Sequence, residues 1–395
     1  MNPDANAVSD ETRIARATLL RISEAATPLV HHVREHGVEQ TLADVRAGAS
    51  IPGVDVSALR GRLAEADGER DLTVAASVGA RLVCPGDEEW PVLLEDLVRI
   101  DADCFGVWVR GAQRLDEVCA RAVAIVGTRT PTAYGEHVAG ELAAGLVERY
   151  WTVVSGLAYG IDAAAHRAAL AGGGPTVGVL ACGVDVVYPH GHRNLVARLV
   201  DEGLVVSEHP PGAAPQRHRF LVRNRIIAAL SLGTVMVEAA RRSGARSTLN
   251  HARDLLRHTM VVPGPVTSAM SDGCHVALRE VIGSVLVTRT EEVIEQCGHL
   301  GELADPLAAP TRPRDRLGPL VRRVFDAVPV MRPAPVERIA LTACVRADVV
   351  EPSLAALRAL GLVERSDEGW RMSRSGRDER HAQARPDGVL PLEWL

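Results

Sequence analysis

The central part of the chain alternates short apolar runs with amphipathic stretches. The apolar runs are three to five residues long and read as buried strands: Ala122–Val126, Thr152–Val154, Thr176–Leu180, Leu204–Val206, Thr234–Val237, Met260–Val262 and Val285–Val287. The stretches between them have the apolar spacing of helices: Glu136–Arg149, Asp162–Ala171, Arg193–Asp201, Arg223–Ala229, Thr248–Arg257 and Val276–Ile282. This alternation predicts an α/β fold with a doubly wound, Rossmann-like parallel sheet, which binds ligands outside the carboxyl ends of its strands.

The flanking segments have different patterns. Residues 1–75 show helical apolar spacing broken by Gly and Pro, which predicts a helical N-terminal domain of the SAM or helix-hairpin-helix type before a core at 76–303. Residues 304–317 are rich in Pro and Arg and predict a linker. Three helical patterns and a hairpin predict a C-terminal winged helix at 318–375, and the aperiodic tail at 376–395 is expected to be mobile.

Composition excludes several kinds of chemistry. All 44 cationic residues are arginine, so neither a Walker-A phosphate lysine nor a Schiff-base lysine is possible. The seven cysteines are scattered and never spaced as CxxC, which argues against a zinc site and a disulfide framework. We therefore expect no metal and no cofactor. No apolar run is long enough to span a membrane, and we expect a soluble, cytoplasmic protein.

The charge is unevenly distributed along the chain. The formal net charge is −6, yet nine arginines lie between Pro210 and Met260 against only Glu238 and Asp254. A local basic surface on an acidic protein indicates a defined site for a polyanion. The alternative is an arginine-rich helix face that is simply solvated.

The first segment with candidate chemistry is AVAIVGTRTPTAYG, which begins at Ala122. A buried strand ends in Gly127, Thr128 and Arg129, so backbone N–H groups, a hydroxyl and a guanidinium meet at one turn. Such a turn can hold a phosphate. The alternative is an ordinary βα turn with a surface arginine. The segment contains no GxGxxG dinucleotide fingerprint.

The second segment is VVSGLAYGIDAAAHRAAL. Gly156 and Gly160 permit a close approach of the backbone, and Asp162 begins a helix. Ser155, Asp162 and His166 suggest a hydrolase triad only superficially. Asp162 and His166 are four residues apart on one helix, no GxSxG elbow is present, and polar residues at helix starts usually cap. We expect no catalytic residues here.

The third segment, PQRHRFLVRNRIIAALSLGTVMVEAARRSGARSTLNHA, places four arginines around Phe220, at positions 217, 219, 223 and 225. Arginines neutralise phosphates while an aromatic ring stacks on a base without reading sequence, and this combination suits a single strand. The alternative role for Phe220 is a core anchor of its helix. Ser243 and Gly244 add a small-residue turn before another helix start.

Six motifs together resemble one family. GTRTPTAYG, SGLAYGIDAAAH, VLACGVDVVYP, SEHPPGAAP, FLVRNRIIAALS and VEAARRSG occur in the order typical of the DNA-processing protein A family (DprA, also called Smf), from about Leu82 through Arg289. The resemblance implies a non-enzymatic homodimer that binds single-stranded DNA without strong sequence preference. It also implies that the protein loads the RecA recombinase during DNA uptake, in natural transformation, and during recombination.

The resemblance also implies where the strand binds. We expect the nucleic-acid site at Gly127, Thr128, Arg129, Ser155, Gly156, Gly160, Arg217, Phe220, Arg223, Asn224, Arg225, Ser243 and Gly244. One departure from the family pattern lies after the YP motif. There His190-Gly191-His192 precedes Arg193-Asn194, where the family usually has an acidic residue followed by Asn.

A second hypothesis comes from the fold, because similar Rossmann-like cores host phosphoribohydrolases that cleave nucleoside monophosphates. A nucleotide-processing enzyme or nucleotide sensor of that kind needs a carboxylate at the sugar. Glu238, at the end of the predicted strand Thr234–Val237, is the only well-placed candidate.

Overall fold

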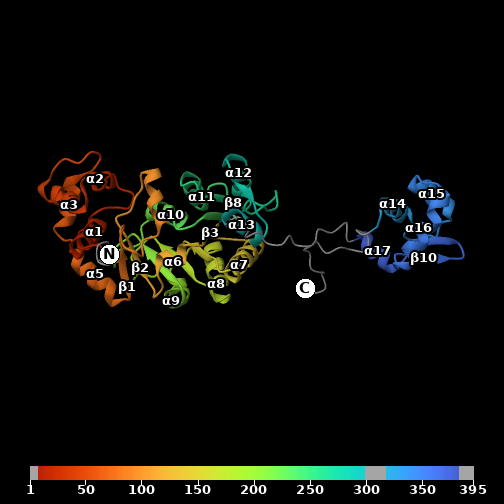
Figure 1. Cartoon of the computed structure of the whole chain (residues 1–395), viewed down its shortest axis with the longest axis horizontal. Coiled ribbons are helices and arrows are strands. Elements are labelled where there is room, and N and C mark those ends of the chain that lie inside the picture. Colours follow the sequence, from red (N-terminus) through yellow and green to blue (C-terminus); the bar gives the residue numbers. More distant parts are fainter. Residues whose placement is uncertain (1–7, 299–316, 382–395) are drawn as a thin grey trace, which may run out of the picture. The chain divides into compact units, whose positions relative to one another are not determined.

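The computed structural model describes residues 8–298 and 317–381, with side chains up to 377. The described residues form two compact units, one within 8–298 and one within 317–381 (Figure 1). The predicted linker at 304–317 falls almost entirely outside the described residues, and so does the predicted tail beyond 381. Within the described ranges, no helix is long and apolar enough to cross a membrane.

The first unit is built on a nine-stranded sheet in the order β1-β2-β6-β5-β4-β3-β7-β8-β9. The seven predicted strands are all present and mutually parallel: β3 (Ala122–Val126), β4 (Thr152–Ser155), β5 (Thr176–Leu180), β6 (Leu204–Ser207), β7 (Gly233–Met236), β8 (His258–Val261) and β9 (Val285–Leu286). The pattern did not predict β1 (Ala80–Val83) and β2 (Val107–Arg110), an antiparallel pair that joins the edge of β6.

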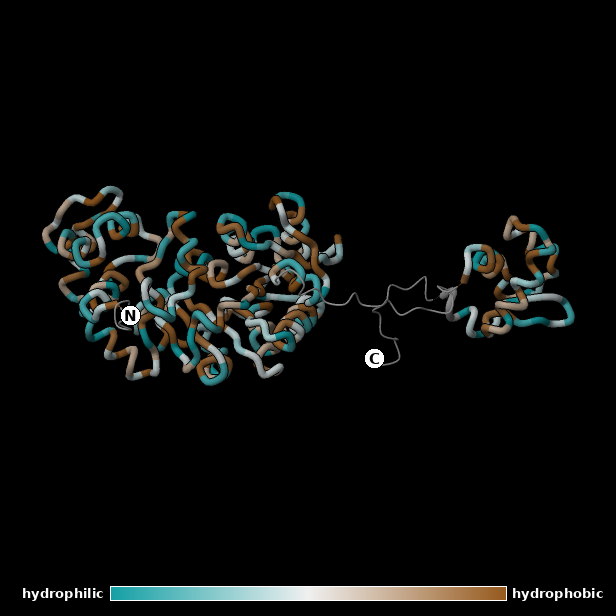
Figure 2. Tube along the Cα trace, in the orientation of Figure 1, coloured by the Kyte–Doolittle hydropathy of each residue, from teal (hydrophilic) through white to brown (hydrophobic). Residues whose placement is uncertain are grey.

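Helices cover both faces of the sheet, as the alternation along β3 requires. Ala122, Ala124 and Val126 pack in a cluster with residues of α10 and α11, whereas Val123 and Ile125 pack with residues of α7 and α8. The doubly wound α/β prediction is therefore confirmed. Hydrophobic segments run through the interior of the unit (Figure 2). The helices of this region are α6 (Leu115–Cys119), α7 (Ala133–Glu148), α8 (Ile161–Ala171), α9 (Arg193–Glu202), α10 (Arg219–Ala229), α11 (Ala245–Asp254), α12 (Asp272–Glu280) and α13 (Thr290–Cys297), with a 3-10 helix at Val92–Ile100.

Five N-terminal helices share a hydrophobic cluster with one end of the sheet. They are α1 (Asp10–Ile22), α2 (Leu29–His36), α3 (Val38–Ala47), α4 (Val56–Leu63) and α5 (Gly68–Ser77). Leu19 and Ile22 share one hydrophobic cluster with Trp108 of β2 and Val205 of β6. The described residues of 1–75 contain these five helices and belong to the same compact unit as the core, and a separate N-terminal domain stays a prediction.

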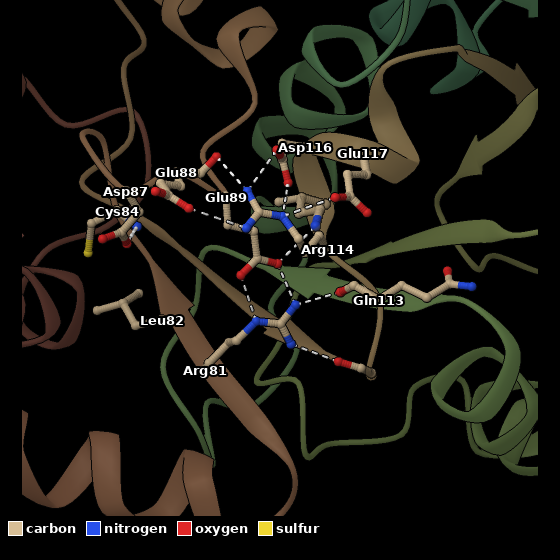
Figure 3. A network of polar contacts seen from close by, with 12 residues as sticks. Arg81, Leu82, Cys84, Asp87, Glu88, Glu89, Gln113, Arg114, Asp116 and Glu117 are labelled. Carbon is tan, nitrogen blue, oxygen red and sulfur yellow. Dashed lines mark hydrogen bonds and ion pairs between the residues drawn. The ribbon is translucent and has the colours of Figure 1, made fainter. Parts of the chain in front are cut away.

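A polar network fastens the antiparallel hairpin β1–β2 to the rest of the unit (Figure 3). The Arg81 guanidinium donates to Glu89 (Nε–Oε2 2.8 Å) and to the carbonyl of Gly111. Glu89 also accepts the backbone N–H of Leu115 at 2.8 Å, at the first residue of α6. The Glu89 carboxylate thus accepts hydrogen bonds from a residue of β1 and from the first residue of α6, and it connects this edge of the sheet to α6.

The second unit contains α14 (Pro319–Ala327), α15 (Val336–Ala343), α16 (Ala347–Ala359) and the antiparallel strands β10 (Val363–Ser366) and β11 (Gly369–Met372). Phe325, Leu354 and Trp370 lie in its hydrophobic core. Three helices followed by a hairpin match the predicted elements, and the winged-helix assignment stays a prediction. Arg374–His381 forms α17, which includes the first residues of the segment 376–395, and the predicted mobility of that segment stays a prediction. The Ser373 hydroxyl accepts the Gly376 N–H there, as a helix cap does.

Candidate nucleic-acid interface

A cleft opens where the strand order of the sheet reverses. The chain places β4, β5 and β6 on one side of β3 and β7, β8 and β9 on the other, so the connections leave β3 and β7 in opposite directions. Sheets of this kind bind ligands at that point. The cleft has a volume of about 280 Å³, and its lining includes Gly127, Thr128, Arg129, Asp162, Phe220, Leu221, Arg223, Asn224, Ser243, Gly244 and Thr248.

Two glycines keep the turns at the cleft close together. A Cβ on Gly127 would come 2.5 Å from the Ile161 side chain. Gly160 has a φ of +83°, and a Cβ there would come 2.3 Å from the Thr128 carbonyl oxygen. The Thr128 N–H donates to the Glu238 carbonyl at 2.7 Å, which ties the ends of β3 and β7 together. These glycines shape the cleft by allowing close backbone approach.

Phe220 lies between a cation and a second aromatic ring. The Arg129 guanidinium carbon is 5.5 Å from the centroid of the Phe220 ring. The Tyr188 ring is 5.4 Å from it between centroids, at an angle of 53°. Phe220 is only partly buried and belongs to none of the hydrophobic clusters in the described part of the chain. This placement does not support the core-anchor alternative for Phe220.

Arg223 forms the buried floor of the cleft. Its side chain is 7% exposed, and its guanidinium donates to the carbonyls of Gly156 (2.8 Å) and Val179. Burial lowers the pKa of Arg223 to about 10, so the group stays charged at neutral pH. Asp162, also buried, accepts the Gly156 N–H at 3.1 Å, and burial raises its pKa. The floor of the cleft therefore combines a buried guanidinium with a buried carboxyl group.

Two predicted contacts are corrected by the structure. Arg225 is 1% exposed, and both its terminal nitrogens donate to Glu208 at 2.8 and 2.7 Å. The Ser155 side chain is fully buried, and its hydroxyl donates to the Ile125 carbonyl at 2.6 Å. Neither polar group is available to a ligand. Arg225 follows Arg223 by two helical positions, about 200° around the axis, and therefore faces the protein interior.

The remaining arginines of the basic segment have separate surroundings. Arg219 pairs with Glu24, two residues after the end of α1, at 2.7 Å, and Arg257 pairs with Asp96 at 2.8 Å. In contrast, the structure describes no ion pair for three exposed arginines, Arg217, Arg241 and Arg242. Arg217 precedes α10 and is not part of the cleft lining.

The Asn224 amide donates to the Gly244 carbonyl at 3.3 Å, which holds the Ser243-Gly244 turn against α10.

Two residues considered in the enzymatic hypotheses, His166 and Glu238, form hydrogen bonds within the protein. His166 is buried, with Nδ1 2.7 Å from the Thr176 hydroxyl, and burial lowers its pKa to about 3. Glu238 is 2% exposed and accepts the backbone N–H (2.9 Å) and the hydroxyl (2.7 Å) of Thr132 at the start of α7. Glu238 is absent from the described lining of the cleft. The Glu238 carboxylate, the candidate of the nucleotide-processing hypothesis, is thus engaged with Thr132.

Comparisons with known proteins show the family of this chain. A family model described as DNA recombination-mediator protein A matches residues 81–298. "Putative DNA processing protein DprA" of Mycobacterium tuberculosis is 44% identical over 378 residues, which cover 93% of this chain and 96% of that protein. DNA processing protein DprA of Streptococcus pneumoniae is 40% identical over 174 residues, 44% of this chain and 61% of that protein. The X-ray structure of DNA processing protein A from Streptococcus pneumoniae superposes with a TM-score of 0.62 at 27% identity, covering 74% of this chain and 100% of that one. The chain therefore belongs to the DNA recombination-mediator protein A family.

Proposed function

We propose that this chain binds single-stranded DNA without strong sequence preference, through the cleft between the ends of β3 and β7, and that it acts as a binding protein and not as an enzyme. The observation that carries the proposal is the contact of Arg129 with the partly exposed Phe220 at the mouth of that cleft. An aromatic ring and a guanidinium this close together can stack on the base and bind the phosphate of the same nucleotide.

The chemistry of the lining explains the lack of sequence preference. A base that stacks on Phe220 presents its π-face, which every base has, and the arginines meet phosphates. A duplex hides these faces inside its base stack, so the cleft favours a single strand. The contacts that we propose are Gly127, Thr128, Arg129, Gly156, Phe220, Arg223, Asn224, Ser243 and Gly244 around the cleft, with Gly160 shaping it. We also propose Arg217, an exposed arginine three residues before Phe220 in the chain.

Two partners complete the proposal. The family description as a recombination mediator supports an action on a RecA-type recombinase during uptake and recombination of DNA.

A second copy of this chain is the other partner. The edge strand β9 supports a homodimer, because Val285 and Leu286 in β9 are exposed and Ile282, in the connection just before it, is 92% exposed. Exposed apolar residues along an open sheet edge favour pairing with another chain.

Single-strand affinity should fall as salt rises. Each phosphate that an arginine neutralises contributes about −0.7 to the slope of the logarithm of the association constant against the logarithm of salt concentration. Fluorescence anisotropy with a labelled oligonucleotide over a series of NaCl concentrations measures the slope. A slope near zero would contradict the role of the arginines. An equal affinity for single and double strands, measured by gel shift, would contradict the proposed preference.

Removal of the second unit should leave single-strand binding largely intact. Residues Leu320–Ser373 carry eight arginines against seven acidic residues, and such a balance gives little attraction toward a polyanion. The first unit contains the whole cleft. A chain that ends at residue 313 should bind within a few-fold of the full-length affinity. A loss of more than about tenfold, near 1.4 kcal/mol, would show that the second unit contributes to binding.

A further inference from the structure

A second, smaller hollow adjoins the cleft, on the side of β4 and β5. Its volume is about 50 Å³. Arg129, Ala158, Phe220 and Arg223 line both the cleft and this hollow, so the contact between Arg129 and Phe220 forms a shared wall. The residues that line only the hollow include Tyr159 and Tyr188. The two depressions therefore follow one another along the carboxyl edge of the sheet.

The two tyrosines present open rings to this hollow. Tyr159 follows β4 and is 50% exposed, and Tyr188 follows β5 and is 38% exposed. The Tyr159 ring packs edge-on against buried His192, with 4.6 Å between centroids. Its hydroxyl lies so close to the next turn that a Cβ on Gly191 would come within 2.7 Å of it. These contacts hold the Tyr159 ring in place while half of the residue stays in solvent.

Two exposed side chains, His190 and Arg193, follow Tyr188 closely in the chain. His190 lies 6.4 Å from Tyr188 between ring centroids and is exposed. Arg193, the first residue of α9, is also exposed, and the structure describes no ion pair for it. Arg193 directly follows His192, the residue on which Tyr159 packs. The hollow thus has two accessible rings, and an exposed arginine directly follows the residue on which one of them packs.

We propose that Tyr159, Tyr188 and Arg193 form a second nucleotide subsite, which holds the strand as it leaves the cleft over the ends of β4 and β5. This subsite rests on the proposed function of the cleft. In this subsite the tyrosine rings would stack on bases, and the Arg193 guanidinium would bind a phosphate. A base cannot enter between Phe220 and Tyr188, because their centroids are 5.4 Å apart and insertion needs about twice the 3.4 Å of one stacked step. Successive bases therefore stack on the outer faces of successive rings.

Substitution of the rings tests the subsite through its dependence on strand length. The variant Tyr159→Ala/Tyr188→Leu removes one ring and replaces the other with a side chain that still packs on Phe220. Affinity for long oligo-dT should fall about 5-fold to 100-fold. Affinity for the shortest oligo-dT that binds, which fills only the cleft, should stay within about twofold. Arg193→Ala should reduce the salt slope by about 0.7 for long strands only.

Matched controls come from the same chain. Tyr150 is 89% exposed and precedes β4, so it lies at the opposite edge of the sheet from Tyr159. Arg46 on α3 is exposed in the N-terminal helices. Tyr150→Ala and Arg46→Ala should bind long strands as the unchanged protein does. Melting temperatures of all variants should agree within a few degrees.

Photo-cross-linking gives a second readout that needs no substitution. Irradiation of the unchanged protein with an oligo-dT that carries 5-iodouracil should yield peptides cross-linked at Tyr159 or Tyr188, and none at Tyr150. Absence of cross-links at both tyrosines, or unchanged affinity of the double variant for long strands, would overturn the subsite. If Phe220→Ala still weakens binding in that case, the cleft stands and only the subsite fails. If the unchanged protein binds no single strand, the proposed function fails with it.

Discussion

Glu208→Gln should lower the free energy of unfolding by about 3–5 kcal/mol, because it leaves a buried arginine without its counterion. Arg225 is 1% and Glu208 7% exposed in their side chains, and two hydrogen bonds of 2.8 and 2.7 Å join them. Arg225 also donates from Nε to the Ala102 carbonyl at 2.9 Å. Glutamine keeps the shape of the side chain and removes the charge. Urea unfolding followed by circular dichroism measures the effect.

Two control variants separate the buried pair from ion pairs in general. Arg253 and Asp254 form an exposed pair at 2.7 Å, so Asp254→Asn should change the free energy of unfolding by less than about 1 kcal/mol. The double variant Arg225→Met/Glu208→Leu replaces both charges by apolar groups and should be more stable than Glu208→Gln. A loss below about 1 kcal/mol for Glu208→Gln would contradict the account. If the folded double variant lost single-strand affinity, Arg225 would be a DNA contact after all.

The fold could largely be predicted from the sequence, because the parallel strands are apolar on both faces. Ala122–Val126 is buried at every position, and this leaves a continuous apolar run. The strands β1 and β2 were not predicted, because they are held by an antiparallel pairing with each other and with β6. Such a pairing depends on residues distant in sequence, and four-residue runs within a mixed stretch do not reveal it.

The candidate site could be predicted only in part. Gly127, Arg129 and Phe220 reach the same cleft because the strand order brings the ends of β3 and β7 together. The spacing of arginines did not show which of them face the cleft. Arg223 and Arg225 have opposite surroundings on one helix, and the difference depends on Glu208, which follows another strand. Tyr188 was missed as a neighbour of Phe220, although it belongs to the VYP motif.

The variants Phe220→Ala and Arg129→Ala should separate stacking from charge neutralisation. Phe220→Ala should weaken single-strand binding by about 1–3 kcal/mol, the contribution of one base stacked on an aromatic ring, and leave the salt slope unchanged. Arg129→Ala should weaken binding to all sequences alike and reduce the salt slope by about 0.7, the share of one phosphate.

The contact between Arg129 and Phe220 predicts that the effects of these two substitutions on binding are not additive. With the guanidinium carbon 5.5 Å from the ring centroid, Arg129 covers the face that a base would use, so the base must displace it before stacking. Arg129→Ala removes this competitor along with the phosphate contact. The loss in the double variant should therefore differ from the sum of the single losses, as expected for residues in contact.

Melting temperatures should stay nearly unchanged, because Phe220 lies outside the described hydrophobic clusters. A stability loss of about 3–5 kcal/mol for Phe220→Ala would identify Phe220 as a core residue and remove it from the proposed site.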